Sequence, residues 1–134
     1  MTLVQMQPRS TEATAVGRTV ADVMDTAGPQ VCDDMTVEVA LSVMASAHTG
    51  HLLVCDDIGL CIGLVTRARL AAVRESSAYS DRVQLRDILG DRGPFTSPVT
   101  TMAEAGRTMR YSHVDALPVV DEHGSALGVL ALAR

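Results

Sequence analysis

Apolar and polar residues follow a helical pattern in two segments of this chain. Between residues 37 and 44, and again between 102 and 109, apolar side chains recur every three or four positions, which places them on one face of a helix. Thr36 and Thr101 immediately precede these segments, where a helix N-cap is expected. The pattern therefore predicts two amphipathic helices with the same start signal.

Each predicted helix is followed by two short apolar runs that a turn separates, which is typical of a β-hairpin. Gly59 and Gly124 stand in the two turns, where a positive φ is favoured. The runs predicted as strands are 52–55, 62–65, 117–120 and 127–130. Short helical turns are predicted at 19–24 and 85–89, and short extended segments at 30–32 and 95–97.

These two sets of elements are copies of one sequence unit. Residues 20–69 align with 85–134 at a constant offset of 65 without a gap, and fourteen of the fifty positions are identical. A gapless match of this kind is the signature of an internal repeat. The first unit continues into a further helix predicted at 67–75, whereas the second stops where that helix would begin.

The chain is thus predicted to have an α/β (α+β) fold built from tandem β-α-β-β(-α) repeats, the second without its C-terminal helix. The predicted parts are an N-terminal segment, partly flexible, at 1–18, a first domain at 19–76, a linker at 77–84 and a truncated second domain at 85–134.

Composition excludes several classes of function. All eleven basic residues are arginine, so the chain has no lysine for a Schiff base or for a phosphate-binding loop of the Walker type. A net charge of -5 and 2% aromatic residues disfavour nucleic acid as a partner. No run reaches eighteen apolar residues and no signal peptide is recognisable, so we expect no membrane partner and a cytoplasmic protein.

The three cysteines, Cys32, Cys55 and Cys61, form no metal-ligand motif, and an odd number disfavours a disulfide scaffold. Cys55 and Cys61 flank a predicted turn and could form a disulfide, but we expect free thiols. No metal site and no Ser-His-Asp or Cys-His catalytic set is predicted. His48 and His113, which repeat at the ends of the predicted helices, are interpreted as helix C-terminal residues.

Residues 117–129, preceded by 97–105, resemble a cystathionine-β-synthase (CBS) domain. The first copy resembles it more loosely over 52–65, with Leu53 where proline is usual. The resemblance covers 19–134 and implies two repeats packed about a pseudo-twofold axis. It also implies a regulatory module without enzymatic activity or a required cofactor, whose cleft binds an adenosine compound (AMP, ADP, ATP or S-adenosylmethionine) and which often forms homodimers.

The resemblance further implies which residues hold the ligand: the first short strand of each repeat, the start of the Leu-Pro-Val-Val strand, and a G-h-x-[ST]-x-x-[DN] segment that leaves the hairpin. The residues at these positions are Val31, Cys32, Asp33, Thr66, Arg69, Phe95, Thr96, Ser97, Pro98, Ala116, Pro118 and Arg134. In that segment a hydroxyl can meet a phosphate, and the carboxylate can accept from ribose hydroxyls.

This sequence departs from the pattern at the carboxylate, which Arg69 and Arg134 replace; the second copy also lacks the hydroxyl, at Ala131. An arginine cannot accept from ribose, but it can hold a phosphate. Two interpretations stay open for Thr66, a phosphate contact or a helix N-cap, and for the arginines, an anion contact or a surface position. Two functions remain open accordingly: ligand sensing, or a structural dimerisation module with a degenerate ligand site.

Overall fold

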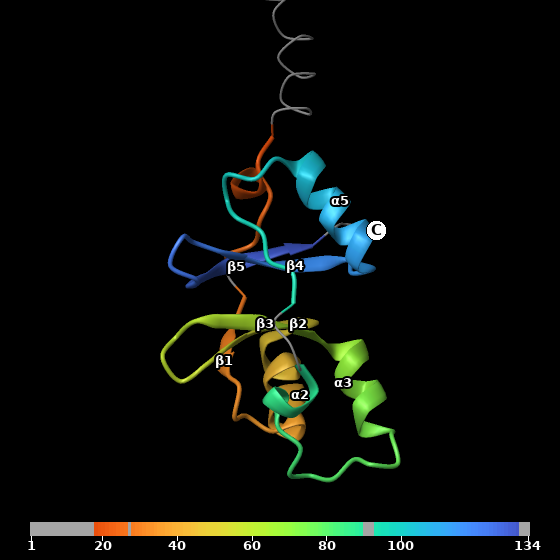
Figure 1. Ribbon diagram of the computed structural model, residues 1–134. Coiled ribbons are helices and arrows are strands. Elements are labelled where there is room, and N and C mark those ends of the chain that lie inside the picture. The colour runs from red at the N-terminus through yellow and green to blue at the C-terminus, as the bar shows by residue number, and fades with distance from the viewer. Residues whose placement is uncertain (1–17, 27, 90–92, 132–134) are drawn as a thin grey trace, which may run out of the picture.

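Two β-hairpins, one from each repeat, lie face to face at the centre of the molecule (Figure 1). The computed structural model describes residues 18–26, 28–89 and 93–131. In the first unit β2 (His51–Cys55) pairs antiparallel with β3 (Cys61–Thr66), and β1 (Gln30–Cys32) pairs parallel with β2. In the second unit β4 (Ala116–Val120) pairs with β5 (Ala126–Ala131) in the register of β2 and β3, shifted by 65 residues. The α+β fold of tandem repeats is confirmed.

The two amphipathic helices cover the outer faces of the hairpins. They are α2 (Val37–Ala47) in the first unit and α5 (Met102–Ser112) in the second. The Thr36 hydroxyl accepts from the backbone N–H of Val39, and the Thr101 hydroxyl accepts from that of Glu104. Both predicted N-caps are therefore present. The first unit continues into α3 (Arg67–Arg74), which packs beside α2.

Three apolar layers result from this arrangement. One lies between the first sheet and its helices and includes Val37, Met44 and Leu52, all fully buried. Another lies between α5 and the second hairpin. The layer that joins the repeats lies between the two sheets, and its buried members are Leu53, Cys55, Cys61, Ala116 and Val129. The two hairpins thus form one common core across the repeat boundary.

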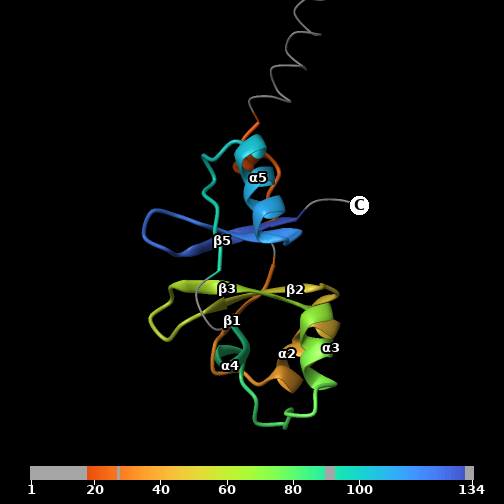
Figure 2. The ribbon, with the colours of Figure 1, turned by 45° about the vertical axis from the view of Figure 1, so that its right-hand side comes forward.

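The short helix at the start of each sequence repeat packs on the body of the other repeat. The helix α4 (Leu85–Leu89) lies beside α2 in the first unit (Figure 2), where the Leu85 side chain is fully buried and its N–H donates to the carbonyl of Met35. The 3-10 helix η1 (Val20–Asp22) lies on the second unit, where the Val20 N–H donates to the carbonyl of Thr100. Each folded unit therefore contains the short helix of the other sequence repeat: α4 belongs to the core of the first unit, and η1 to the core of the second.

The second sheet lacks the third strand that was predicted at 95–97. Only Thr96 pairs with β4, through a single bridge to Val119. In the first unit two further hydrogen bonds join β1 and β2: the Leu53 N–H donates to the carbonyl of Pro29, and the Asp33 N–H donates to the carbonyl of Cys55. Their counterparts in the second unit are Pro118 and Pro98, which have no N–H to donate. Proline at both positions explains why the predicted strand is reduced to one bridge.

His48 and His113 end α2 and α5 in the left-handed conformation, with φ of 53° and 57°. Helix C-terminal placement is confirmed, although this conformation is the one that favours glycine. None of the described helices is long and apolar enough to cross a membrane.

We expect His48→Gly to stabilise the protein by about 0.5–1 kcal/mol, because glycine adopts the left-handed cap without steric cost. Urea denaturation monitored by circular dichroism measures the change. Ala47→Gly, one residue earlier in the helix, is the matched control and is expected to destabilise by a similar amount. Equal destabilisation by both substitutions would contradict the prediction.

Candidate functional site

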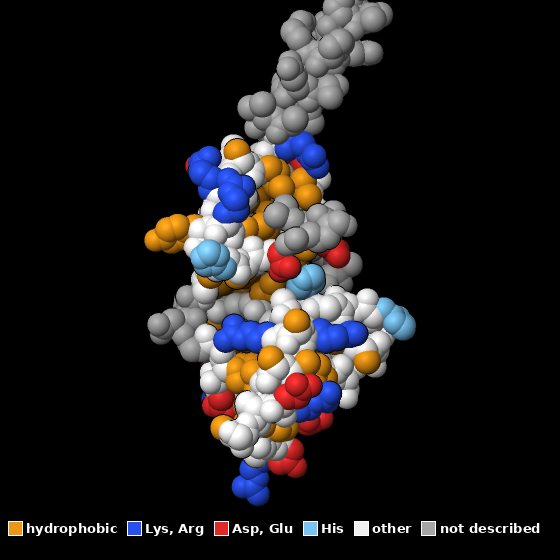
Figure 3. Space-filling view, turned by 90° about the vertical axis from the view of Figure 1, so that its right-hand side faces the viewer, with side chains coloured by type: hydrophobic (Ala, Val, Ile, Leu, Met, Phe, Trp, Pro, Cys, Tyr) orange, Lys and Arg blue, Asp and Glu red, His pale blue; other side chains and the backbone are white. Residues whose placement is uncertain are grey.

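A cleft of about 270 Å³ lies between the two units, at the end of β3 and the start of β4. Its first-unit wall includes Thr66 and Arg69, and its second-unit wall runs from His113 to Pro118. Figure 3 shows the side of the molecule that carries α3: arginine side chains lie just below the waist between the units, and acidic and histidine side chains lie just above it. Both repeats therefore contribute to this cleft.

Thr66 is the N-cap of α3, because its hydroxyl oxygen accepts a 3.2 Å hydrogen bond from the backbone N–H of Arg69. The N-cap interpretation is thus confirmed. A hydroxyl that accepts one bond keeps its own proton for donation. Thr66 can therefore cap the helix and still donate to a ligand atom in the cleft.

The Arg69 side chain connects the cleft to α4. Its Nη2 donates to the backbone carbonyl of Ile88, in the last turn of that helix. A guanidinium has five N–H donors, so this one bond leaves others for a carboxylate or a phosphate. The bond to Ile88 also anchors the guanidinium at the cleft wall, which reduces the entropy that ligand binding would cost.

The second-unit wall holds three residues that the sequence prediction missed, His113, Val114 and Asp115. His113 is the left-handed cap of α5, and Asp115 immediately precedes β4. The predicted Ala116 and Pro118 lie on the same wall. The signal for Asp115 was its position directly before Ala116, on the strand that the resemblance already placed at the ligand.

The residues predicted from the first short strand of each repeat do not line this cleft. Val31 packs in the core under α2, and the Asp33 carboxylate forms a 3.5 Å ion pair with Arg86; Cys32 lies between them in the sequence. The corresponding residues of the second unit, Phe95, Thr96, Ser97 and Pro98, line a separate groove on the second unit. Gly93 and Pro94, which precede them in the sequence, line the cleft instead.

Near the position that the repeat relates to this cleft, the backbone of Asp25 pairs with that of Val129. The Asp25 N–H donates to the Val129 carbonyl at 2.8 Å, and the Val129 N–H donates to the Asp25 carbonyl at 2.9 Å. Ala131 stands there in place of Thr66. The predicted Arg134 lies outside the described residues, so the cleft at Thr66 and Arg69 is the candidate site.

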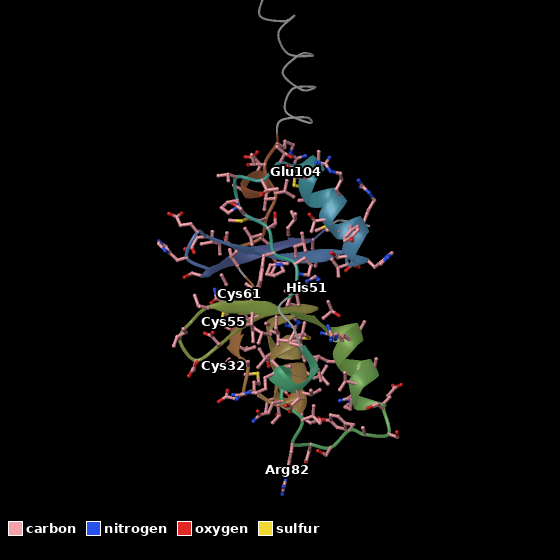
Figure 4. All side chains as sticks on the ribbon, in the orientation of Figure 1. Cys32, His51, Cys55, Cys61, Arg82 and Glu104 are labelled. Atoms are coloured by element: carbon pink, nitrogen blue, oxygen red, sulfur yellow. The ribbon has the colours of Figure 1, made fainter. Side chains whose placement is uncertain are left out.

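The three cysteines align across the first sheet, since Cys32 is the register partner of Cys55, and Cys55 that of Cys61. All three are free thiols (Figure 4), as predicted. Burial raises the pKa of the Cys55 thiol, and the negative charge of Asp56 raises it further. The described residues contain no cluster of three or more His, Cys, Asp or Glu that could hold a metal ion.

We expect iodoacetamide at pH 8 to modify Cys32 in the folded protein at least tenfold faster than Cys55. Cys32 is half-buried, whereas Cys55 is buried and its raised pKa leaves less of the reactive thiolate at any given pH. Peptide mass mapping after timed labelling measures the rates, and labelling in urea serves as the control, where the rates should converge. Equal rates in the folded protein would contradict this.

Residues 20–76 and 85–133 each match the family model of the CBS domain. The chain is also 29% identical over 114 residues to homoserine O-acetyltransferase of Methanohalophilus mahii, a match that covers 84% of this chain and 23% of that enzyme. This chain therefore spans about a quarter of the length of the curated relatives that it matches.

Solved structures of CBS domain pairs share the fold. CBSX2 in complex with AMP has a TM-score of 0.72 and 25% identity, and the match covers 86% of this chain and 90% of that one. The CBS domain pair of protein MJ0100, in complex with 5'-methylthioadenosine and S-adenosyl-L-methionine, has a TM-score of 0.73 and 15% identity, with 84% and 88% covered. These similarities agree with the pairing of two repeats around a shared core.

Proposed function

Since the chain belongs to the CBS domain family, with both repeats matched, we propose that it is a non-enzymatic regulatory module that senses an adenosine compound in the cleft between its repeats. The observation that carries the proposal is the cleft itself, which Thr66 and Arg69 of one repeat and residues 113–118 of the other enclose together. A ligand that touches both repeats binds one relative arrangement of them better than another. Such a ligand would therefore shift the module between conformations or partners.

The chemistry of the cleft supports an adenosine compound. Leu64, Leu89 and Val114 offer aliphatic surface for a purine, and Arg69 and Thr66 offer donors for a polar tail. Phe95, which the resemblance assigns to the ligand, lines the separate groove instead. The adenine would thus lie between aliphatic side chains alone.

The proposal predicts that an adenosine compound raises the melting temperature of the full chain. Differential scanning fluorimetry with AMP, ADP, ATP and S-adenosylmethionine measures this, since a ligand at a hundred times its Kd adds about 2.7 kcal/mol to the stability. Arg69→Ala should reduce the shift. Arg67→Ala is the matched control, because Arg67 also donates to a backbone carbonyl, that of Thr49, but does not line the cleft.

The absence of a shift with all four compounds would overturn the proposed function. An undiminished shift in Arg69→Ala would instead remove Arg69 from the site. The outcome for Arg67→Ala separates loss of ligand binding from a general loss of stability, since both variants lose one guanidinium bond to backbone.

The second candidate function is dimerisation, and exposed apolar side chains support it. Tyr111 on α5 is 88% exposed and Val99 is 79% exposed, and a partner that covered these side chains would remove their apolar surface from water. We propose a cytoplasmic homodimer that buries them. Sedimentation equilibrium of the full chain tests the proposal, and a monomer at all concentrations would overturn it.

A further inference from the structure

One side of α5 is open where the corresponding side of α2 is covered. In the first unit α3 runs antiparallel to α2 (Figure 2): the Arg67 N–H donates to the carbonyl of Gly50, just beyond the end of α2, and Arg74 forms a 3.8 Å ion pair with Glu38 in its first turn. On the second hairpin the described residues place only η1 and α5. Within the part of the chain that the structure describes, α5 therefore has no counterpart of α3 beside it.

The open side of α5 consists of the residues at the repeat positions of the α2 side that faces α3: Ala103, Gly106 and Arg110. The counterpart of Gly106 is Leu41, which packs in the cluster that contains Leu70 of α3. Ala103 and Arg110 are exposed, and a Cβ atom on Gly106 would lie 3.5 Å from Nη1 of Arg110. The open side thus offers two small residues and the aliphatic stem of an arginine, against which an apolar side chain can pack.

The chain enters the second unit along the path by which it passes from α3 to α4 in the first. Before α4, the Val83 carbonyl accepts a 3.0 Å hydrogen bond from the N–H of Val37, at the start of α2. Before η1, the Arg18 carbonyl accepts a 2.9 Å bond from the N–H of Met102, at the start of α5. The next residue in each case forms a bridge with the helix N-cap: Gln84 with Thr36, and Thr19 with Thr101. Residues 1–17 therefore precede η1 at the place in the chain where α3 and its linker precede α4.

The sequence of residues 1–17 carries the apolar spacing of α3. Leu3 and Met6 stand three positions apart, as do Leu70 and Val73, the residues of α3 that pack in the first-unit core. Pro8 follows two positions after Met6, and the C-cap of α3 follows two positions after Val73. Helices usually end at or before the residue that precedes a proline. The pattern therefore predicts a short helix that ends before Pro8, with Leu3 and Met6 on one side.

The length and charge of this segment fit the open side of α5. Twelve positions separate Met6 from Arg18, and ten separate Val73 from Val83, so Met6 can reach the place on α5 that Val73 has on α2. The side chains of residues 1–17 include one arginine and one glutamate, so they carry no net charge for Arg110 to repel. A helix of this length is not stable in isolation, so its formation depends on packing.

We propose that residues 1–7 dock as a short helix on the open side of α5, antiparallel to it, with Leu3 and Met6 packed against Gly106 and the stem of Arg110. The N-terminal segment then completes the second unit as α3 completes the first. No residue of the open side lines the cleft between the repeats, so this docking is independent of the proposed function.

NMR spectroscopy of the full chain tests the docking. We expect nuclear Overhauser effects between the methyl group of Met6 and the α-protons of Gly106. We also expect amide hydrogen exchange in residues 4–7 to be at least about tenfold slower than in a synthetic peptide of residues 1–17.

Substitutions in the segment test its apolar side. Leu3→Asp and Met6→Asp should each bring the exchange of residues 4–7 to the rate of the peptide, because a carboxylate cannot be buried on this side without a partner. Gln5→Asp is the matched control, because Gln5 lies on the opposite side of the predicted helix. This variant should keep the slow exchange.

Ala103→Glu tests the docking from the side of α5. If nothing covered Ala103, a glutamate in this first turn would stabilise α5, because an acidic side chain complements the helix dipole there. Docking predicts the opposite sign, a lower melting temperature together with faster exchange in residues 4–7.

Several outcomes would overturn the proposal. One is exchange at the rate of the peptide in residues 4–7 of the full chain, without the Overhauser effects. Slow exchange that disappears on dilution would assign the docked segment to a second copy and contradict docking within one chain. A higher melting temperature of Ala103→Glu, or equal loss of protection in Gln5→Asp and Leu3→Asp, would also contradict it. None of these results bears on ligand binding in the cleft, so the two proposals fail separately.

Discussion

Leu85→Ala is expected to destabilise the first unit by about 2–5 kcal/mol, although Leu85 belongs to the second sequence repeat. The Leu85 side chain is fully buried among the residues of α2, β2 and β3, and its truncation leaves a cavity that the surrounding sheet cannot fill. Urea denaturation measures the loss, and native-state hydrogen exchange locates it. Faster exchange is expected in α2 and β1 to β3.

The matched control is Val20→Ala, at the repeat counterpart of Leu85. Val20 is also fully buried, but in the core of the second unit, against Met109 and Leu117. Its truncation should therefore accelerate exchange in α5, β4 and β5. If Leu85→Ala accelerated hydrogen exchange only in α5, β4 and β5, the packing of α4 on the first unit would be contradicted.

Gly128→Ala is expected to destabilise the second unit by about 1–3 kcal/mol or more, through overpacking. A Cβ atom at this position would lie 2.5 Å from the backbone oxygen of Asp25 and 3.2 Å from the Cα of Thr26. Backbone cannot rotate away as a side chain can, so the paired bonds between Asp25 and Val129 would have to lengthen. Thermal and urea denaturation measure the effect.

Gly63→Ala, the same substitution in the other repeat, provides the matched control. A Cβ atom at Gly63 would meet the Cδ2 atom of Leu89 at 3.2 Å, and the end of a leucine side chain can shift by a few tenths of an ångström. We expect less than about 1 kcal/mol of destabilisation there. If Gly63→Ala were as harmful as Gly128→Ala, close backbone approach would not be the cause at Gly128.

Both repeats line the cleft, with Arg69 on one wall and residues 113–116 on the other. Arg69 is held by a carbonyl of α4, a helix that belongs to the second sequence repeat but packs on the first unit. A ligand bound at Arg69 would therefore be linked, through this hydrogen bond, to the segment that leads into the second unit. This connection offers a physical route from ligand binding to the relative arrangement of the repeats.

Much of the local structure could be predicted from the sequence, because it depends on interactions between near neighbours. Helix periodicity, the caps Thr36 and Thr101, and the turn glycines Gly59 and Gly124 all act within a few residues, and each is present in the structure. The second sheet was predicted less well. The lost strand depends on two prolines, Pro98 and Pro118, that act together only once the strands are adjacent.

The candidate site was predicted in part. Thr66, Arg69, Ala116 and Pro118 line the cleft, and they were identified because a sequence pattern marks the ends of the strands on which they lie. Residues 31–33 and 95–98 were assigned to the same site, but none of them lines the cleft. Asp115 was not assigned to the site, because its repeat counterpart is Gly50 and only its position directly before Ala116 connects it with the predicted residues.

The sequence by itself thus determined that the chain consists of two α/β repeats and where their helices and hairpins lie, since periodicity and caps are local. Only the tertiary structure decided that Leu85 and Val20 pack on the opposite unit, that the backbone of Asp25 lies against Gly128, and that Asp115 lines the same cleft as Arg69. These features depend on contacts between segments tens of residues apart, which burial of the shared core selects and no local pattern encodes.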